Sequence, residues 1–296
     1  MRTWQPHTQR LSALAFSPDG RLLATTAGQS KLVWLWDAAT GAPVRKLSGG
    51  EFPARAVCFS PDGKRVAAMQ AGPDVRVWEV ETGKVVGVLA VEGGGPKSLA
   101  FAPAGALIVA RWGAAFVWTD PVGGSPTAPR PHDDVVHTGG AAERVGCTPT
   151  GRFVWARQGI VTVSADPGRP APGFANPVGW AAVNDFAFTR DETRLAVAYQ
   201  SRTAAVFDLT DPSARPVVLS GHKGQQVRAI GFTPDGRTVV TVGNDGTGRF
   251  WDAATGSVLR VFDWGLGVLA EAAFAPDGLT CAAGSAKGKV VVWDLD

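Results

Sequence analysis

The stretch Phe16-Ser-Pro-Asp-Gly20, followed by Trp36-Asp37, decides the fold because it recurs along the chain. The turn motif returns as Phe59-Ser-Pro-Asp-Gly63, Phe232-Thr-Pro-Asp-Gly236 and Phe274-Ala-Pro-Asp-Gly278, with weaker copies at Phe101-Ala-Pro-Ala-Gly105, Cys147-Thr-Pro-Thr-Gly151 and Phe188-Thr-Arg-Asp-Glu192. The leading residues of consecutive copies are 41 to 46 positions apart. A repeat of this period indicates stacked copies of one structural unit.

A second motif follows each turn, 16 to 20 positions after the leading residue. Its seven copies are Trp36-Asp37, Trp78-Glu79, Trp118-Thr119, Val163-Ser164, Phe207-Asp208, Trp251-Asp252 and Trp293-Asp294. Two motifs that keep their spacing seven times predict seven copies of the unit.

The first unit shows how each copy is expected to fold. Residues 11–16 form an apolar-rich run, and Ser17-Pro-Asp-Gly20 has the chemistry of a type I turn, because proline fixes φ at its second position. Further strands are predicted over residues 21–26, 31–36 and 43–47. The unit is therefore an antiparallel sheet of four strands, and it needs a neighbour on each of its two faces.

The composition agrees with many short strands. The 296 residues include 37 glycines and 21 prolines, which interrupt helices and favour turns. Apolar residues make up 45% of the chain, enough for a packed core. No apolar run is long enough to cross a bilayer, and the first residues lack the apolar segment of a secretory signal. Cys58, Cys147 and Cys281 are interpreted as buried thiols of a reducing cytosol, so the expected location is cytoplasmic.

The paired motifs resemble the WD40 repeat family over essentially the whole chain. The sixth unit is most similar: Gly221-His222 leads into it, Phe232-Thr-Pro-Asp-Gly236 forms the turn, and Asp245 precedes Trp251-Asp252. The resemblance implies an all-β fold, a seven-bladed β-propeller of four-stranded antiparallel blades around a central channel. Residues 1–296 would then form a single domain.

The resemblance assigns a structural role to four residues of the sixth unit. His222, Thr241, Asp245 and Trp251 match the family's hydrogen-bonded tetrad, which links neighbouring strands. A histidine, an aspartate and a hydroxyl could also be interpreted as a hydrolase triad. The structural interpretation is preferred because a triad needs an exposed nucleophile beside an oxyanion hole.

The first unit carries a partial version of this tetrad. His7, Thr26 and Trp36 stand at the positions taken as equivalent, and Ser30 replaces the aspartate. We expect an incomplete hydrogen-bond network there.

The two ends of the chain are expected to complete one blade together. The last unit stops three residues after Trp293 and so lacks its outer strand, while residues 2–5 precede Pro6-His7 at the start of the first unit. We predict that residues 2–5 supply the missing strand. This pairing would close the ring and remove open sheet edges.

The third and fourth units depart most from the pattern. Residues 119–131 and 166–172 are rich in proline and glycine, and the fourth unit lacks the leading phenylalanine, the turn aspartate and the tryptophan. An alternative parsing has six blades and an irregular insert between about residues 119 and 180.

One cluster has the residue types of a metal site, and it consists of His132, Asp133, Asp134 and His137. Its surroundings are rich in proline and glycine, with no regular element to fix the ligands, so no metal site is predicted. His137 alternatively corresponds to the histidine that leads into a blade.

The sequence shows no catalytic or cofactor signature. Phosphate-loop, dinucleotide-binding, zinc-protease and nucleophile-elbow motifs are absent, so neither an enzyme activity nor a cofactor is predicted. The alternative is a propeller enzyme or a small-ligand binder with its site in the central channel. Glu143, Asp185 and Glu271, near the start of the first strands, are the candidates for it. A net charge of +3 with scattered Lys and Arg argues against nucleic acid.

The predicted function is a non-catalytic scaffold that binds a peptide or protein partner, with acidic segments, on the face at the channel mouth. The candidate contact residues are Phe52, Arg55, Lys97, Trp112, Trp180, Arg228 and Trp264. Tryptophan and arginine dominate the energetics of interfaces. Alternatively, the tryptophans fold inward and plug the channel. We further expect a monomer without membrane association, and the Ala/Gly/Arg-rich composition suggests a bacterial source.

Overall fold

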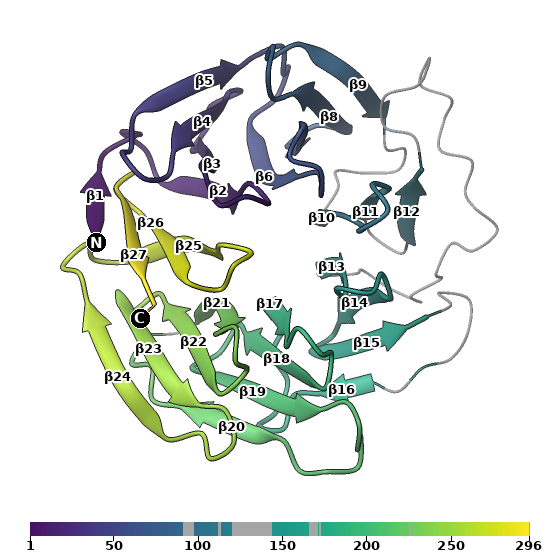
Figure 1. Ribbon diagram of the computed structural model, residues 1–296, viewed down its shortest axis with the longest axis vertical. Coiled ribbons are helices and arrows are strands. Elements are labelled where there is room, and N and C mark those ends of the chain that lie inside the picture. Colours follow the sequence, from purple (N-terminus) through teal and green to yellow (C-terminus); the bar gives the residue numbers. More distant parts are fainter. Residues whose placement is uncertain are drawn as a thin grey trace.

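The computed structural model describes residues 1–90, 98–111, 114–119, 144–165, 171, 173–224 and 226–295. These residues form strands, turns and loops, and the strands assemble into seven antiparallel sheets arranged as blades around a central axis (Figure 1). Six sheets have four strands, and the third blade has three within the described residues. The all-β, seven-bladed propeller predicted from the repeats is confirmed.

The first three strands of each blade run from the axis toward the rim in chain order. The inner strands are β2 (Leu11–Phe16), β6 (Ala54–Phe59), β10 (Ser98–Phe101), β13 (Arg144–Cys147), β17 (Val183–Phe188), β21 (Val227–Phe232) and β25 (Leu269–Phe274). The second strands are β3 (Leu22–Ala27), β7 (Arg65–Gln70), β11 (Leu107–Arg111), β14 (Phe153–Arg157), β18 (Arg194–Tyr199), β22 (Thr238–Gly243) and β26 (Thr280–Ser285).

The third strands are β4 (Val33–Asp37), β8 (Asp74–Glu79), β12 (Ala114–Trp118), β15 (Ile160–Ser164), β19 (Thr203–Asp208), β23 (Thr247–Asp252) and β27 (Val290–Asp294). The outer strands are β5 (Pro43–Leu47), β9 (Val85–Ala90), β16 (Gly173–Ala175), β20 (Val217–Ser220), β24 (Val258–Asp263) and β1 (Arg2–Trp4). The weak fourth unit forms a complete sheet, β13 to β16, so the six-blade parsing is wrong.

The recurrent motif forms the turn between the first two strands of a blade. In the first blade the amide of Gly20 donates to the carbonyl of Ser17 at 2.9 Å, and Gly20 has a φ of 71°. This left-handed conformation explains why the motif ends in glycine. The fifth blade ends its turn with Glu192 instead, at a φ of 53°.

Glu192 couples the fifth blade to the fourth. Its carboxylate accepts hydrogen bonds from the backbone amide of Thr150 at 2.6 Å and from the Arg152 guanidinium at 2.6 and 3.0 Å. The side chain of Glu192 is almost fully buried in this contact. A charge-assisted, two-pronged contact of this kind offsets part of the strain of a non-glycine residue at positive φ.

The apolar core is divided among the blades. In the described residues it forms seven clusters, and each cluster combines side chains from two neighbouring blades. Leu35 of the first blade and Trp78 of the second, for example, lie in one cluster and are both fully buried. Each blade therefore depends on the neighbours on both of its sides.

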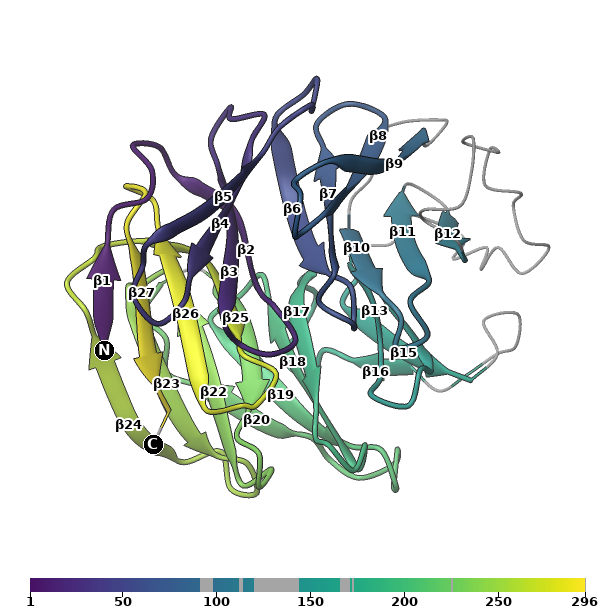
Figure 2. The ribbon, with the colours of Figure 1, turned by 45° about the horizontal axis from the view of Figure 1, so that its top comes forward.

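The N-terminal strand closes the ring. β1 pairs antiparallel with β27, with Arg2 opposite Val292 and Trp4 opposite Val290, and the two strands lie side by side in Figures 1 and 2. The side-chain amide of Gln5 adds a hydrogen bond of 2.9 Å to the carbonyl of Lys287. The predicted closing strand is confirmed, and it spans residues 2–4.

Removing residues 1–9 should destabilise the whole propeller, because the deletion exposes the edge of β27 and uncovers the cluster between blades seven and one. We expect the melting temperature to fall by at least about 5 °C, equivalent to roughly 2 kcal/mol. Differential scanning calorimetry measures the change. The full-length His7→Ala variant separates the loss of the strand from the loss of that side chain, and a truncated chain that melts with the wild type would refute the closure.

Candidate functional site: the channel mouth

Two sets of loops meet at one end of the channel, which we call the channel mouth. The described lead-in loops are residues 5–10, 48–53, 176–182, 221–224 and 264–268, and the turns between second and third strands are residues 28–32, 71–73, 158–159, 200–202, 244–246 and 286–289. Backbone hydrogen bonds join the two sets, such as Gly28 to Arg10 at 2.8 Å and Gln200 to Ala182 at 2.7 Å. The turns that contain the Pro-Asp-Gly motif lie at the opposite end of the strands.

The structure separates the predicted contact residues. Trp180 is 79% exposed in the lead-in loop of the fifth blade, and Phe52 is 39% exposed. Arg55 is exposed and Arg228 is half-buried. Lys97 and Trp112 lie outside the described residues.

The inner strands enclose a cavity of about 550 Å³ along the axis. The residue before the last one of each inner strand is small, and the described channel-lining examples are Ala15, Cys58, Ala100, Ala187, Gly231 and Ala273. These small side chains leave the channel open. The tryptophans that the structure describes do not fill this cavity, so the plugging alternative fails for Trp180 and Trp264.

Charged side chains gather at the mouth end of this cavity. Arg144 of β13 donates to Asp185 of β17 at 2.8 Å, and the second oxygen of Asp185 accepts the backbone amide of Ile230 at 3.2 Å. Burial raises the pKa of Asp185 above its usual value, and Arg144 opposes that shift. The ion pair fixes the position of the Asp185 side chain.

Glu271 of β25 faces the same group of charges. Burial raises the pKa of its carboxyl to about 7, although the guanidinium groups of Arg144, Arg228 and Arg10 favour its ionised form. Two of the three sequence candidates for a channel site, Asp185 and Glu271, are thus brought together. Glu143 lies outside the described residues.

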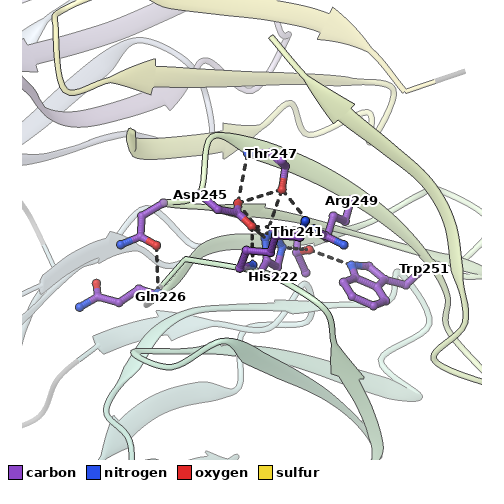
Figure 3. Close-up of polar contacts among 9 residues, drawn as sticks. His222, Gln226, Thr241, Asp245, Thr247, Arg249 and Trp251 are labelled. Atoms are coloured by element: carbon purple, nitrogen blue, oxygen red, sulfur yellow. Dashed lines mark hydrogen bonds and ion pairs between the residues drawn. The ribbon is translucent and has the colours of Figure 1, made fainter. Parts of the chain in front are cut away.

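The tetrad of the sixth blade is assembled between β22, β23 and the lead-in loop (Figure 3). Nδ1 of His222 lies 3.1 Å from both carboxylate oxygens of Asp245, and Nε2 lies 2.8 Å from the hydroxyl of Thr241. The indole N–H of Trp251 donates to that hydroxyl at 2.8 Å. Thr241 has no exposed surface, so its hydroxyl cannot act as a nucleophile.

The tetrad holds one protonation state at neutral pH. Burial lowers the pKa of His222, so the ring is neutral. Burial also opposes ionisation of Asp245, but His222 and hydrogen bonds from Lys223 and Thr247 bring the pKa of this carboxyl down to about 2. A neutral His222 then donates from Nδ1 and accepts the Thr241 hydroxyl at Nε2.

The first blade corrects one residue of the predicted partial tetrad. Nε2 of His7 lies 2.8 Å from the hydroxyl of Thr25, which also accepts the indole N–H of Trp36 at 2.8 Å. Thr26, the residue predicted for this place, instead donates to the carbonyl of Ala54 in the next blade at 2.8 Å. Adjacent residues of a strand point to opposite faces, so a shift of one position exchanges the two roles.

Trp264 takes a role that the sequence argument missed. Its ring lies 4.1 Å from the ring of Trp293, at the place where His222 meets Trp251 in the preceding blade. A Cβ at Gly248 would come within 2.3 Å of the Trp264 ring, so the side chain is wedged between blades six and seven. Trp264 is therefore a packing residue and not an open contact residue.

A signal for this role was present in the sequence. His222 precedes its leading phenylalanine by ten residues, and Trp264 precedes Phe274 by the same interval. Ala283 pairs with Val291 where the sixth blade has Thr241 paired with Arg249, so the seventh blade lacks the hydroxyl. A contact between two tilted tryptophan rings takes the place of the polar tetrad there.

Neither a metal cluster nor a membrane helix is found in the described ranges. No three His, Cys, Asp or Glu side chains lie together as potential ligands in that part of the chain. No helix in it is long and apolar enough to span a membrane. His132, Asp133, Asp134 and His137 lie outside these ranges.

Comparison with known families agrees with the fold. The family described as WD domain, G-beta repeat matches residues 1–37, 215–252 and 266–294. These segments are the closing strand with most of blade one, most of blade six with the strand before it, and most of blade seven. The matched segments carry WD40 repeats, and the chain folds as a seven-bladed β-propeller. His7 and His222 lie within the matched segments.

Curated proteins similar to this chain include the following three. Protein tipD of Dictyostelium discoideum is 22% identical over 311 residues, which cover 99% of this chain and 41% of that protein. An uncharacterized WD repeat-containing protein of Synechocystis is 34% identical over 59 residues, covering 20% of this chain and 17% of the relative. Autophagy-related protein 18 of Meyerozyma guilliermondii is 32% identical over 78 residues, 26% of this chain and 14% of the relative. The chain spans less than half the length of each relative.

Substitution His222→Ala should lower stability, because it removes a buried hydrogen-bond partner of Asp245 and Thr241 together. We expect a loss of roughly 1–3 kcal/mol in the free energy of unfolding. Urea unfolding followed by tryptophan fluorescence measures this loss. The exposed Lys223→Ala variant keeps the backbone amide that Asp245 binds and serves as the control. Equal stability of His222→Ala and wild type would contradict the tetrad.

Substitutions Trp264→Ala and Trp180→Ala should differ in their effect. Trp264 packs on Trp293, so its loss leaves a cavity between blades and should cost about 3 kcal/mol. Trp180 is exposed, so its loss should change stability by no more than about 0.5 kcal/mol. Thermal melts of the two variants make the comparison, and equal melting temperatures would show that Trp264 is not a packing residue.

Proposed function

We propose that this WD40 propeller is a non-catalytic scaffold that binds a protein partner at the channel mouth. The observation that carries the proposal is the exposure of Trp180, at 79%, beside Val178, at 57%, in one lead-in loop. Large apolar side chains presented together on a surface mark interaction sites more often than isolated ones do. Tryptophan is also the residue type most enriched among interface hot spots.

The loop that carries Trp180 is held in place by its backbone. The amide of Asn176 donates to the carbonyl of Gly159 at 3.1 Å, and the Asn176 side chain accepts the amide of Val178 at 3.0 Å. Gln200 binds the carbonyl of Ala182 at the other end of the loop. A loop fixed before binding loses little conformational entropy when a partner arrives.

The charge at the mouth favours a partner with acidic segments. Arg10 and Arg55 are exposed there, and Arg228 is half-buried beside the channel. Complementary charge increases the association rate and excludes partners of the wrong sign. A cytoplasmic location accords with the three cysteines, which form no disulfide.

The proposal is tested by capture and then by titration. A partner is captured from lysate on immobilised wild-type protein, its bound segment is mapped, and that segment is titrated by isothermal calorimetry. We expect Trp180→Ala and Arg55→Ala each to weaken the segment's binding about tenfold or more. Val258→Ala, which removes an exposed apolar side chain from the rim strand β24, is the matched control.

Two outcomes would overturn the proposal. Binding that is lost in Val258→Ala but retained in Trp180→Ala and Arg55→Ala would place the interface on the rim. Conversion of the captured segment into a product by the purified protein would rule out a non-catalytic role.

A further inference from the structure

We propose that the central channel binds a carboxylate carried on an apolar body, with the carboxylate held by Arg228 and Arg10 at the mouth. The apolar body would then extend along the axis toward the phenylalanines at the far end. The inference deepens the scaffold role, since an acidic side chain of a partner has this chemistry. It applies equally to a free organic acid.

The charged side chains that line the cavity, Arg144 and Asp185, lie at its mouth end. Arg144, Asp185 and Glu271 each stand three residues before the last residue of an inner strand, and Arg228 stands four before it. Every inner strand except β13 ends in a phenylalanine, and all six of them line the cavity: Phe16, Phe59, Phe101, Phe188, Phe232 and Phe274. Three residues of strand span about 10 Å, so the two ends suit the two ends of one amphipathic ligand.

At the mouth end of the channel, three arginines face two carboxyl groups. Arg144 is already paired with Asp185 at 2.8 Å, and Asp185 also accepts a backbone amide. That leaves Arg10 and Arg228 facing the single carboxyl of Glu271. Nε of Arg228 is buried and has no hydrogen-bond partner among the described residues. A buried guanidinium N–H without an acceptor is costly, and a ligand carboxylate would supply the acceptor.

The walls away from the charges are apolar. Leu14 and Ala15 of blade one, Val57 of blade two and Leu99 of blade three line the cavity together with the phenylalanines. Its volume of about 550 Å³ lies in the range of small-molecule sites.

Glu271 acts as an internal competitor for the ligand. The charged groups that face it are Arg10 before β2, Arg144 on β13, Asp185 on β17 and Arg228 on β21. When Glu271 is ionised it neutralises the arginines that a ligand carboxylate would use. Because its pKa is about 7, protonation below neutral pH removes this competition and frees the site for an anion.

Hexanoate is the first probe, titrated by isothermal calorimetry into the full chain at constant ionic strength in a buffer without carboxylate or phosphate. We expect a dissociation constant in the millimolar range, with binding about tenfold tighter at pH 6 than at pH 8. Glu271 is mostly neutral at pH 6 and mostly ionised at pH 8, because its pKa is about 7. Hexanamide, which has the same apolar body and no charge, should bind at least about tenfold more weakly.

Two variants assign the effect to residues. Arg228→Met should weaken hexanoate binding at least about tenfold at pH 6. Glu271→Gln should bind hexanoate with the same affinity at pH 6 and pH 8, since the competing charge is gone. Arg202→Met removes an exposed arginine of the turn between β18 and β19 and should change neither result.

Several outcomes would overturn the proposal. They are no binding of hexanoate at either pH, equal binding of hexanamide, and an unchanged pH dependence in Glu271→Gln. If Arg228→Met does not fold, as judged by its thermal melt, the Glu271→Gln pH profile decides alone.

A peptide arm distinguishes the two sources of the carboxylate. The mapped partner segment is titrated with its acidic residues intact and then with the corresponding amides, in the presence and absence of hexanoate. If hexanoate competes with the acidic segment but not with its amide version, an acidic side chain of the partner occupies the channel. Hexanoate binding without competition shows that the channel takes a free acid, and it leaves the scaffold role to be judged by the Trp180→Ala titration.

Discussion

Apolar contact between neighbouring blades is the interaction on which the rest of the structure depends. Each described cluster of the core joins two blades, and one of them lies between blades seven and one. A single blade has no core of its own, so no blade is expected to be stable alone. The ring must therefore close, and closure by β1 is the step that gives the first and last blades their second neighbour.

This constraint also shapes the channel. Gly231 lines the cavity and also packs against the next blade, because a Cβ there would lie 2.6 Å from the Phe274 ring. Ala15 likewise lines the cavity and packs against the cluster between blades one and two. Charged side chains such as Arg144 and Asp185 lie at the mouth end. The small residues of the inner strands therefore serve the blade contacts as well as the channel.

The fold was predictable because its motifs are local. The Pro-Asp-Gly turn needs only its own residues, and the register of each strand follows from it, which is why the strand predicted over residues 11–16 matches β2. Choosing Thr26 in place of Thr25 shows the limit of such reasoning. Those two residues differ only in which face of β3 they occupy, and spacing alone fixes that face only when the turn length is known.

The site was less predictable because it is assembled from distant units. Trp264 packs against Trp293, which lies in a different strand, and the sequence motifs do not link these two residues. Arg10 and Glu271 are 261 positions apart in the sequence and meet only because the ring closes. Which charged side chains meet at the channel depends on the number of blades and on which blades lie next to each other. The spacing of motifs along the sequence does not state either of these directly.

The orientation of β1 against β27 has a mechanical consequence. Arg2 stands opposite Val292, near the C-terminal end of β27, and the pairing then runs inward to Trp4 and Val290. Tension applied between the two chain ends would load these backbone bonds one after another, as in a zipper, instead of shearing them all together. The pairing of β1 with β27 is therefore the first part of the ring to open under pulling. Its release would expose to water the apolar side chains that pack between blades seven and one.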